Sequence, residues 1–203
     1  MIFNPDFNAE VEKLGTELYE KTGISLRLLM IKELGKDQSI VDYEKDIMKN
    51  FSEPTVLLTF SENNSKVDIY AYPTSLYEYF DKRQVLSPVA SSVQAFFMAL
   101  VYNNGYDSFK EIVSNYGGTI IPLLAAKKKG AQGKYSAAMY NGYADIAEQI
   151  AISKNVELVN AAGNANKITM TVIKLLFYGV IIYAIFVYIK NKMYARRQER
   201  ESK

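Results

Sequence analysis

The chain has 203 residues, with 24 Lys and Arg against 22 Asp and Glu, so its formal net charge is only +2. It contains no cysteine and no histidine, which excludes disulfides, thiolate nucleophiles and most zinc, copper and haem ligation. Most of the small positive excess lies in the C-terminal tail, so nucleic-acid binding has little electrostatic basis. Any chemistry would rest on carboxylates, Lys, Arg, Tyr or Ser, or on a hard cation bound by oxygen.

Two helices and one strand are predicted in the first 51 residues. Residues 8–22 carry apolar side chains at helical spacing between charged ones, and Gly23 is placed to end this helix. Residues 24–32 form a short continuous apolar run, which is typical of a buried strand. Ser39 can cap the next helix, with Asp42 three residues later. The buried stripe of this second helix is predicted to consist of Ile40, Tyr43, Ile47 and Phe51.

Two further strands are predicted after Pro54. Residues 55–60 (TVLLTF) and 66–72 (KVDIYAY) are separated by the turn-forming SENNS, which predicts a hairpin. Alternation along the second strand points Val67, Ile69 and Ala71 inward. The order helix, strand, helix, strand, strand predicts a parallel pair joined by a right-handed crossover, with an antiparallel strand added.

The second half of the soluble part is predicted to be mainly helical. Helices are expected over residues 75–86, 91–104, 108–116 and 135–154, with an edge strand at 119–126, where Pro122 is tolerable. Between the last two elements lies a loop, AKKKGAQGK, whose glycines do not have the spacing of a phosphate-binding loop. This loop is either solvated or in contact with anionic headgroups through Lys127, Lys128, Lys129 and Lys134.

An apolar stretch covers residues 168–189, broken only by Lys174, and a basic tail follows at 190–203. A helix of about 20 apolar residues crosses a hydrocarbon core of about 30 Å, so a transmembrane helix is predicted here, with a buried core helix as the alternative. Residues 157–167 are predicted to be a flexible linker to it. The positive-inside rule places the tail in the cytoplasm, on the strength of Lys190, Lys192, Arg196, Arg197 and Arg200.

The sidedness of the soluble domain is left open by the sequence. The start, MIFNPDFNAEVEKLG, lacks the charged and apolar regions of an export signal. We favour a periplasmic or other extracytoplasmic domain on the cell inner membrane, with a signal peptide missing from the given chain. The alternative is a tail-anchored protein whose domain lies in the cytoplasm.

Several segments together resemble the TPM domain family. They are EKTGISLRLLMIK, a helix that opens SIVDYEKD, the strands VLLTF and KVDIYAY, and the late helix YNGYADIAEQIA. The resemblance covers residues 3–156 and implies an α/β (α+β) fold, a small mixed sheet sandwiched between helices, followed by one C-terminal transmembrane helix. It also implies roles as varied as photosystem repair, acid phosphatase activity and ion-channel support, and most bacterial members have no assigned role.

Carboxylates are the candidate metal ligands. Members of the family carry an acidic residue and a glycine before the second strand, where the loop helps to hold Ca²⁺, whereas this chain has SEPTVLL there. Asp6 is a further acidic residue near a loop where the family places carboxylates. From the residues themselves, we expect Glu53, Asp68 and Asp81 to converge at strand ends and hold Ca²⁺ or Mg²⁺, or else to be solvated turn charges.

These observations favour a single-pass, membrane-anchored TPM-like domain that serves as a non-enzymatic interaction or maturation module for cell-envelope proteins. A metal-dependent phosphatase that uses the three carboxylates is one alternative, and a cytoplasmic tail-anchored adaptor is another. The expected partners are the lipid bilayer and other membrane or envelope proteins, with no nucleic acid. No cofactor is firmly implied beyond Ca²⁺ or Mg²⁺.

Overall fold

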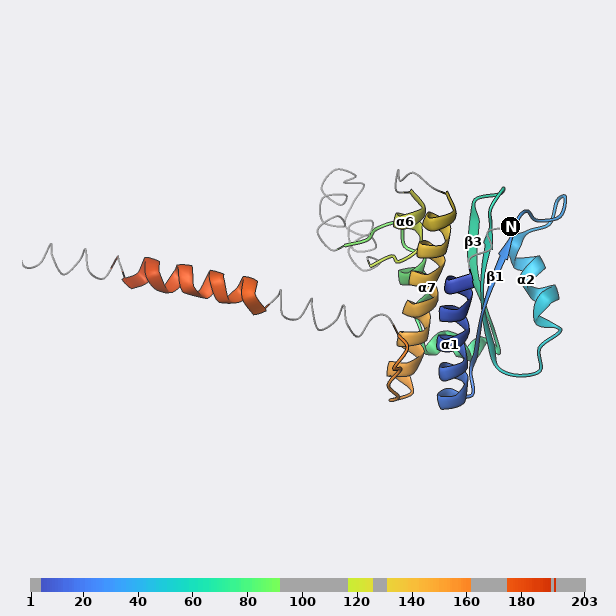
Figure 1. The fold of residues 1–203 in the computed structure, drawn as a ribbon, viewed down its shortest axis with the longest axis horizontal. Helices are drawn as coiled ribbons and strands as arrows, with labels where there is room; N and C mark the ends of the chain where they lie inside the picture. The colour runs from blue at the N-terminus through green and yellow to red at the C-terminus, as the bar shows by residue number, and fades with distance from the viewer. Residues whose placement is uncertain (1–4, 92–116, 126–130, 162–174, 191, 193–203) are drawn as a thin grey trace, which may run out of the picture. The chain divides into compact units, whose positions relative to one another are not determined.

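The computed structural model describes residues 5–91, 117–125, 131–161, 175–190 and 192. The chain divides into two compact units, Met1–Ala161 and Ala162–Lys203. The first unit is a mixed α/β domain with a three-stranded sheet (Figure 1). It extends through Ala161, so it includes the first five residues of the predicted linker.

The sheet has the predicted topology. Its strands are β1 (Ser25–Ile31), β2 (Thr55–Ser61) and β3 (Lys66–Tyr72). The spatial order is β1-β2-β3, with β1 parallel to β2 and β2 antiparallel to β3. A parallel pair requires a long crossover, and the segment that contains the helix α2 (Ile40–Met48) supplies it. The mixed sheet inferred from the order of elements is therefore confirmed.

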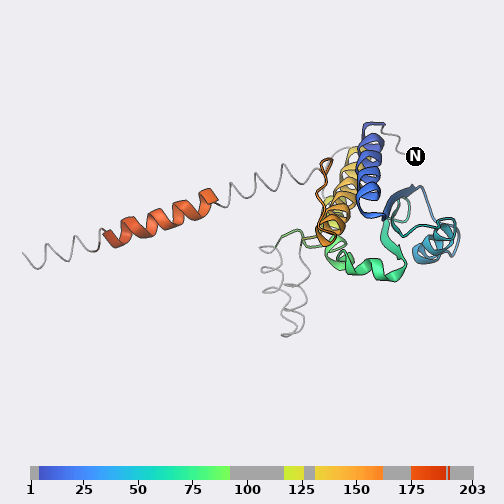
Figure 2. The same cartoon turned by 90° about the horizontal axis from the view of Figure 1, so that it is seen from below.

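Helices cover both faces of this sheet. Figure 1 shows α1 (Pro5–Thr22) and α7 (Ala131–Ser153) on one side and α2 on the other. The view from below shows α1 and α7 side by side (Figure 2), and the two helices contact each other and β1. The α2 helix contacts β2 and β3 instead. The central strand β2 is consequently buried along its whole length.

Side chains of β2 alternate between two buried layers. Val56, Leu58 and Phe60 belong to the main hydrophobic core, together with the inward face of α1 and α7. Since successive side chains of a strand point to opposite faces, Thr55, Leu57 and Thr59 lie on the α2 side. Of the inward residues predicted for β3, Ile69 and Ala71 are fully buried and Val67 is half-buried.

Two tyrosine hydroxyls satisfy backbone groups of the sheet. Tyr143 of α7 donates to the carbonyl oxygen of Leu26 in β1, at 2.8 Å. This hydroxyl lies against Gly15 of α1, where a Cβ atom would meet it. At the outer side of β3, a second tyrosine forms a bridge with two backbone groups of the strand: the hydroxyl of Tyr77 accepts from Ala71 N–H and donates to Ile69 C=O.

The start of α2 is as predicted, but its buried face is not. The Ser39 hydroxyl accepts a hydrogen bond from the backbone N–H of Asp42 at 3.0 Å and caps the helix. The predicted stripe of Ile40, Tyr43, Ile47 and Phe51 is only half-buried. The two buried residues of α2 are Glu44 and Met48, so a carboxyl group faces the sheet.

The segments after β3 depart from the predicted pattern. The helix expected over residues 75–86 is divided into a 3₁₀ turn, η1 (Thr74–Glu78), and a short α3 (Lys82–Val85). The edge strand expected at 119–126 is wrong, because the structure has a helix there, α6 (Ile121–Ala125). Pro122 lies in its first turn, where a missing N–H costs nothing and the fixed φ favours a helix. The helices predicted over 91–104 and 108–116 lie outside the described residues, apart from residue 91.

The second unit contains a described helix over residues 175–190, and its apolar side chains are mostly exposed. At 1.5 Å per residue the described part of this helix spans about 24 Å. In the part of the chain that the structure describes, no helix combines the length and the apolar character needed to cross a membrane. The predicted transmembrane helix at 168–189 is therefore corrected, and with it the single-pass anchoring and the placement on a cell inner membrane.

The basic residues on which the positive-inside prediction rests lie at the C-terminal end of this unit. Lys190 and Lys192 are helical. Arg196, Arg197 and Arg200 lie outside the described residues, as do the residues at 162–174 where the predicted linker ends and the apolar stretch begins.

Candidate functional site

Glu53, the first candidate metal ligand, is engaged by an arginine. It lies just before β2, and its carboxylate pairs with the guanidinium of Arg27 in β1 at 2.7 Å. The same guanidinium lies over the ring of Phe51, 4.2 Å from its centroid. The hydrogen bond from Arg27 lowers the pKa of Glu53. Glu53 therefore joins the beginning of β2 to the neighbouring strand.

The other two predicted ligands also have structural partners. Asp81 is the N-cap of α3 and accepts hydrogen bonds from the backbone N–H groups of Arg83 and Gln84, at 2.9 and 3.0 Å. Asp68 of β3 forms an ion pair with Lys82 at 2.7 Å, and its side chain is only 13% exposed. Residues at the start of α3 thus hold both Asp68 and Asp81, whereas Arg27 of β1 holds Glu53.

The three predicted ligands do not converge. Asp68 lies opposite Thr59 in the sheet, whereas Glu53 precedes Thr55 at the start of the same strand. The strand from Thr55 to Thr59 alone spans roughly 13 Å at about 3.3 Å per residue, and Glu53 lies beyond Thr55. Within the described ranges, no group of three or more His, Cys, Asp or Glu side chains could hold a metal ion.

A polar layer that the sequence analysis missed lies between α2 and the sheet. Glu44 of α2 is fully buried, and so is Thr59 of β2. In the register of β2 and β3, Thr59 is directly opposite Asp68, so their side chains share the α2 face. Lys82 reaches Asp68 from the start of α3. We call these four residues the α2-face polar cluster.

The electrostatics of this cluster centre on Glu44. Burial raises the pKa of its carboxyl group to about 8, because an ionised carboxylate loses its hydration there. The Thr59 hydroxyl and the Lys82 ammonium act in the opposite direction, and the negative charge of Asp68 adds to the rise. At neutral pH, Glu44 is therefore mostly protonated. The burial of Glu44 could have been predicted from the sequence. Glu44 lies four residues after Ile40 and four before Met48, on the face of α2 that they share.

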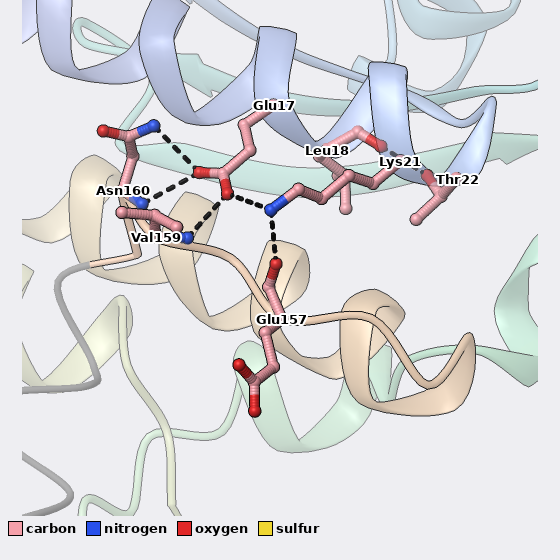
Figure 3. A network of polar contacts seen from close by, with 7 residues as sticks. All are labelled: Glu17, Leu18, Lys21, Thr22, Glu157, Val159 and Asn160. Carbon is pink, nitrogen blue, oxygen red and sulfur yellow. Dashed lines mark hydrogen bonds and ion pairs between the residues drawn. The ribbon is translucent and has the colours of Figure 1, made fainter.

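A second polar network fixes the segment that follows α7 (Figure 3). The carboxylate of Glu17 in α1 accepts hydrogen bonds from the backbone N–H groups of Val159 and Asn160, at 2.6 and 2.8 Å, and from the Asn160 amide at 2.9 Å. Lys21 donates both to Glu17 and to the carbonyl oxygen of Glu157, each at 2.6 Å. Burial acts to raise the pKa of Glu17, but the donors outweigh it and hold the pKa at about 2. Glu17 is therefore ionised across the physiological range.

A shallow hollow of about 590 Å³ lies beside this network. It is lined by α1 between Ala9 and Glu20 and by Val159 and Asn160. Three of the lining side chains are glutamates and one, Lys13, is basic, so the lining is acidic. Val159 is 81% exposed at its edge, which adds an apolar contact point.

The predicted basic loop is only partly described. Lys134 lies within α7, which begins four residues earlier than predicted, and its ammonium donates to the carbonyl oxygen of Leu124 at 2.8 Å. Lys134 therefore joins α7 to α6. Lys127, Lys128 and Lys129 lie outside the described residues.

Comparison with known proteins yields little. No protein-family model matches the chain, and no curated protein sequence matches it. Among solved structures, the NMR structure of the BA42 protein from the psychrophilic bacterium Bizionia argentinensis aligns with a TM-score of 0.43 at 12% sequence identity. The alignment covers 78% of this chain and 92% of that one. A likeness at this level carries no conclusion about function.

Proposed function

We propose that this chain contains a TPM-like α/β domain that works as a non-enzymatic interaction module for other proteins. The segments that resemble the TPM family fold as a helix, a parallel pair of strands with a helical crossover, and an antiparallel third strand. A small mixed sheet between helices is what the resemblance implies, and this supports the proposal. One observation carries the functional part. Each carboxylate considered for metal-dependent catalysis is held in a separate structural contact.

The acidic hollow on α1 is the proposed docking surface. Its lining glutamates attract a partner segment that carries Lys or Arg, because complementary charge steers association and fixes orientation. Glu12 and Glu20 are exposed in this lining, whereas the charge of Glu17 is already paired with Lys21. The exposed side chain of Val159 offers apolar contact beside them. The partner is therefore expected to present basic side chains next to at least one apolar side chain.

Site-specific photo-crosslinking tests this surface. A photoreactive amino acid is placed at Lys13 in the hollow, or at Asp46 on the exposed side of α2 as the matched control. A distinct crosslinked protein from Lys13 that is absent from Asp46 supports the proposal, provided that Glu12→Lys weakens the crosslink. The same background products from both positions would contradict it.

The phosphatase alternative has a direct assay. The purified chain is incubated with a generic phosphomonoester in the presence of Ca²⁺ or Mg²⁺. Turnover that Glu53→Ala abolishes would favour the enzyme and sink the non-enzymatic proposal. We expect no turnover, because Glu53 and Asp68 lie too far apart to share one cation.

A further inference from the structure

The strand β1 lies at one edge of the sheet, and part of its backbone points away from β2. At the start of β1, the N–H of Ser25 donates to the carbonyl oxygen of Pro54 at 2.8 Å, on the β2 side. Successive residues of a strand point their backbone groups to alternate sides. The N–H and C=O groups of Leu26, Leu28 and Met30 therefore face the outer edge of the sheet.

Most of these outward groups are free. The carbonyl oxygen of Leu26 accepts the hydrogen bond from the Tyr143 hydroxyl. Among the described residues, by contrast, none forms a hydrogen bond with the outward N–H or C=O groups of Leu28 or Met30. At the opposite edge of the sheet, the Tyr77 hydroxyl covers two backbone groups of β3. The second half of β1 thus has an open edge at which another strand can pair.

The strand also lacks the features that usually protect a sheet edge. Such edges carry proline, a bulge or free charged side chains, whereas β1 reads SLRLLMI and pairs with β2 in an unbroken register. Its one charged residue, Arg27, is paired with Glu53 and lies over Phe51. On the α2 side of the strand, Leu29 and Ile31 are only half-buried. Free backbone groups therefore lie beside partly exposed apolar side chains, as strand addition requires.

We propose that this edge pairs with β1 of a second copy of the chain, in antiparallel orientation, about a two-fold axis at Leu29. In this register Leu28 of each copy lies opposite Met30 of the other, so the free N–H and C=O groups of both residues are all paired. On the α2 side, the two Leu29 side chains face each other and Arg27 lies opposite Ile31. No like charges are opposed, and the contact is self-complementary, as two-fold symmetry demands.

Neighbouring registers are less favourable. Moving the axis one residue toward the N-terminus would require the carbonyl oxygen of Leu26, which already accepts from Tyr143. Moving it one residue toward the C-terminus would require the carbonyl oxygen of Lys32, which accepts from the N–H of Asn63 at 2.8 Å. An axis at Arg27 would place two arginines directly opposite each other. The free backbone groups and the charge of β1 therefore select one register, and this contact does not use the acidic hollow on α1.

Sedimentation velocity of the full chain tests the pairing, in a nonionic detergent that covers the exposed apolar side chains of residues 175–190. We expect wild type to form dimers at about 100 μM or below. Leu29→Lys should raise the dissociation constant of the dimer at least about tenfold, because two ammonium groups would meet at the two-fold axis. Leu29→Glu should have the same effect. An equimolar mixture of the two variants should restore dimers, because opposite charges then face each other.

Disulfide crosslinking reports the register directly, because the chain contains no cysteine. Residues directly opposite in a non-hydrogen-bonded antiparallel pair have Cα atoms about 4.5 Å apart, which a disulfide can bridge. Two copies of residue 31 would be separated by four positions along the strands, or roughly 13 Å. Under mild oxidation, Leu29→Cys should therefore crosslink to itself at least about tenfold faster than Ile31→Cys, the matched control on the same face of β1.

Circular dichroism first confirms that each variant is folded, and the wild-type and cysteine measurements decide the matter if a charged variant is not. The proposal is overturned if wild type remains monomeric up to about 100 μM, or if dimers persist unchanged in both Leu29→Lys and Leu29→Glu. It is equally overturned if the mixture of these variants restores no dimer, or if Leu29→Cys crosslinks no faster than Ile31→Cys.

Discussion

Glu17→Gln is expected to destabilise the domain through the segment that follows α7. Figure 3 shows the carboxylate receiving two backbone N–H groups, the Asn160 amide and the Lys21 ammonium. A glutamine side chain keeps one acceptor oxygen but has no charge, and its NH₂ group faces donors. The substitution therefore removes at least one of the two backbone hydrogen bonds and the ion pair, while leaving the volume of the side chain almost unchanged.

The pKa of Glu17 sets the size of the effect. Its fall from 4.5 in the unfolded chain to about 2 in the folded domain means that folding favours the ionised form. At 1.36 kcal/mol per pKa unit this is worth about 3 kcal/mol at neutral pH. The Lys21 side chain is 37% exposed, so solvent screens part of its contribution, and about 2 kcal/mol is the expected loss in the variant. For a domain of this size the melting temperature should fall by about 4–8 °C.

Urea unfolding of wild type and variant at several pH values measures this difference. Because the folded pKa is lowered, the stabilisation is fully present above pH 4.5 and is lost as the pH falls through about 2. The gap between the two unfolding free energies should therefore be constant from pH 7 to about 5 and should close toward pH 2. Glu20→Gln, which changes an exposed carboxylate on the same helix, serves as the control and should shift stability by less than about 0.5 kcal/mol.

Two results would refute the reasoning. A Glu17→Gln variant as stable as wild type at pH 7 would show that the network contributes nothing net. A loss that persists unchanged to pH 2 would show that it arises from packing and not from the charge of Glu17.

Three further predictions concern other buried contacts. In metal-free buffer, the unfolding free energy of wild type should fall by about 3–5 kcal/mol from pH 4.5 to 8, because the folded pKa of Glu44 is raised to about 8. Urea titrations of Glu44→Gln should lack this fall. Parallel plots of unfolding free energy against pH for wild type and variant would contradict the prediction. Gly15→Ala should lower the free energy of unfolding by about 1–3 kcal/mol, because the added Cβ atom displaces the Tyr143 hydroxyl. Gly133→Ala, whose Cβ atom would lie in open space, should not lower the melting temperature. Equal effects of the two substitutions would disprove the steric argument. Tyr77→Phe should lower the free energy of unfolding in urea by about 1–2 kcal/mol, because the two hydrogen bonds of the Tyr77 hydroxyl to β3 are lost. An unchanged urea midpoint would show that these hydrogen bonds contribute nothing net to stability.

Local sequence patterns were sufficient for the elements whose signals lie within a few residues. The apolar run of β1, the alternation in β3 and the capping pair Ser39 and Asp42 each predict the structure found. Pro122 shows where such signals become ambiguous. A short apolar segment with one proline suits an edge strand or the first turn of a helix equally well, and contact with α7 selects the helix.

The candidate site could not be predicted from local sequence patterns. The sequence predicts Glu53, Asp68 and Asp81 as joint ligands because all are acidic residues near strand ends. Strand register separates Glu53 from Asp68, and Asp81 caps α3. The apolar residues of α2 predict a buried face that leaves Glu44 out. A rotation of that face by one position brings Glu44 over the sheet.

The sequence by itself determined the order of the helices and strands in the first 72 residues and the mixed topology of the sheet. Those features depend on side-chain periodicity and on caps, which act between neighbours in the chain. Tertiary structure alone decided which polar groups meet. Glu17 accepts hydrogen bonds from the backbone of Val159 and Asn160, and Glu44 lies near Thr59 and Asp68. The physical reason is that such contacts join residues far apart in sequence, and strand register and helix rotation, which no local pattern records, set their distances.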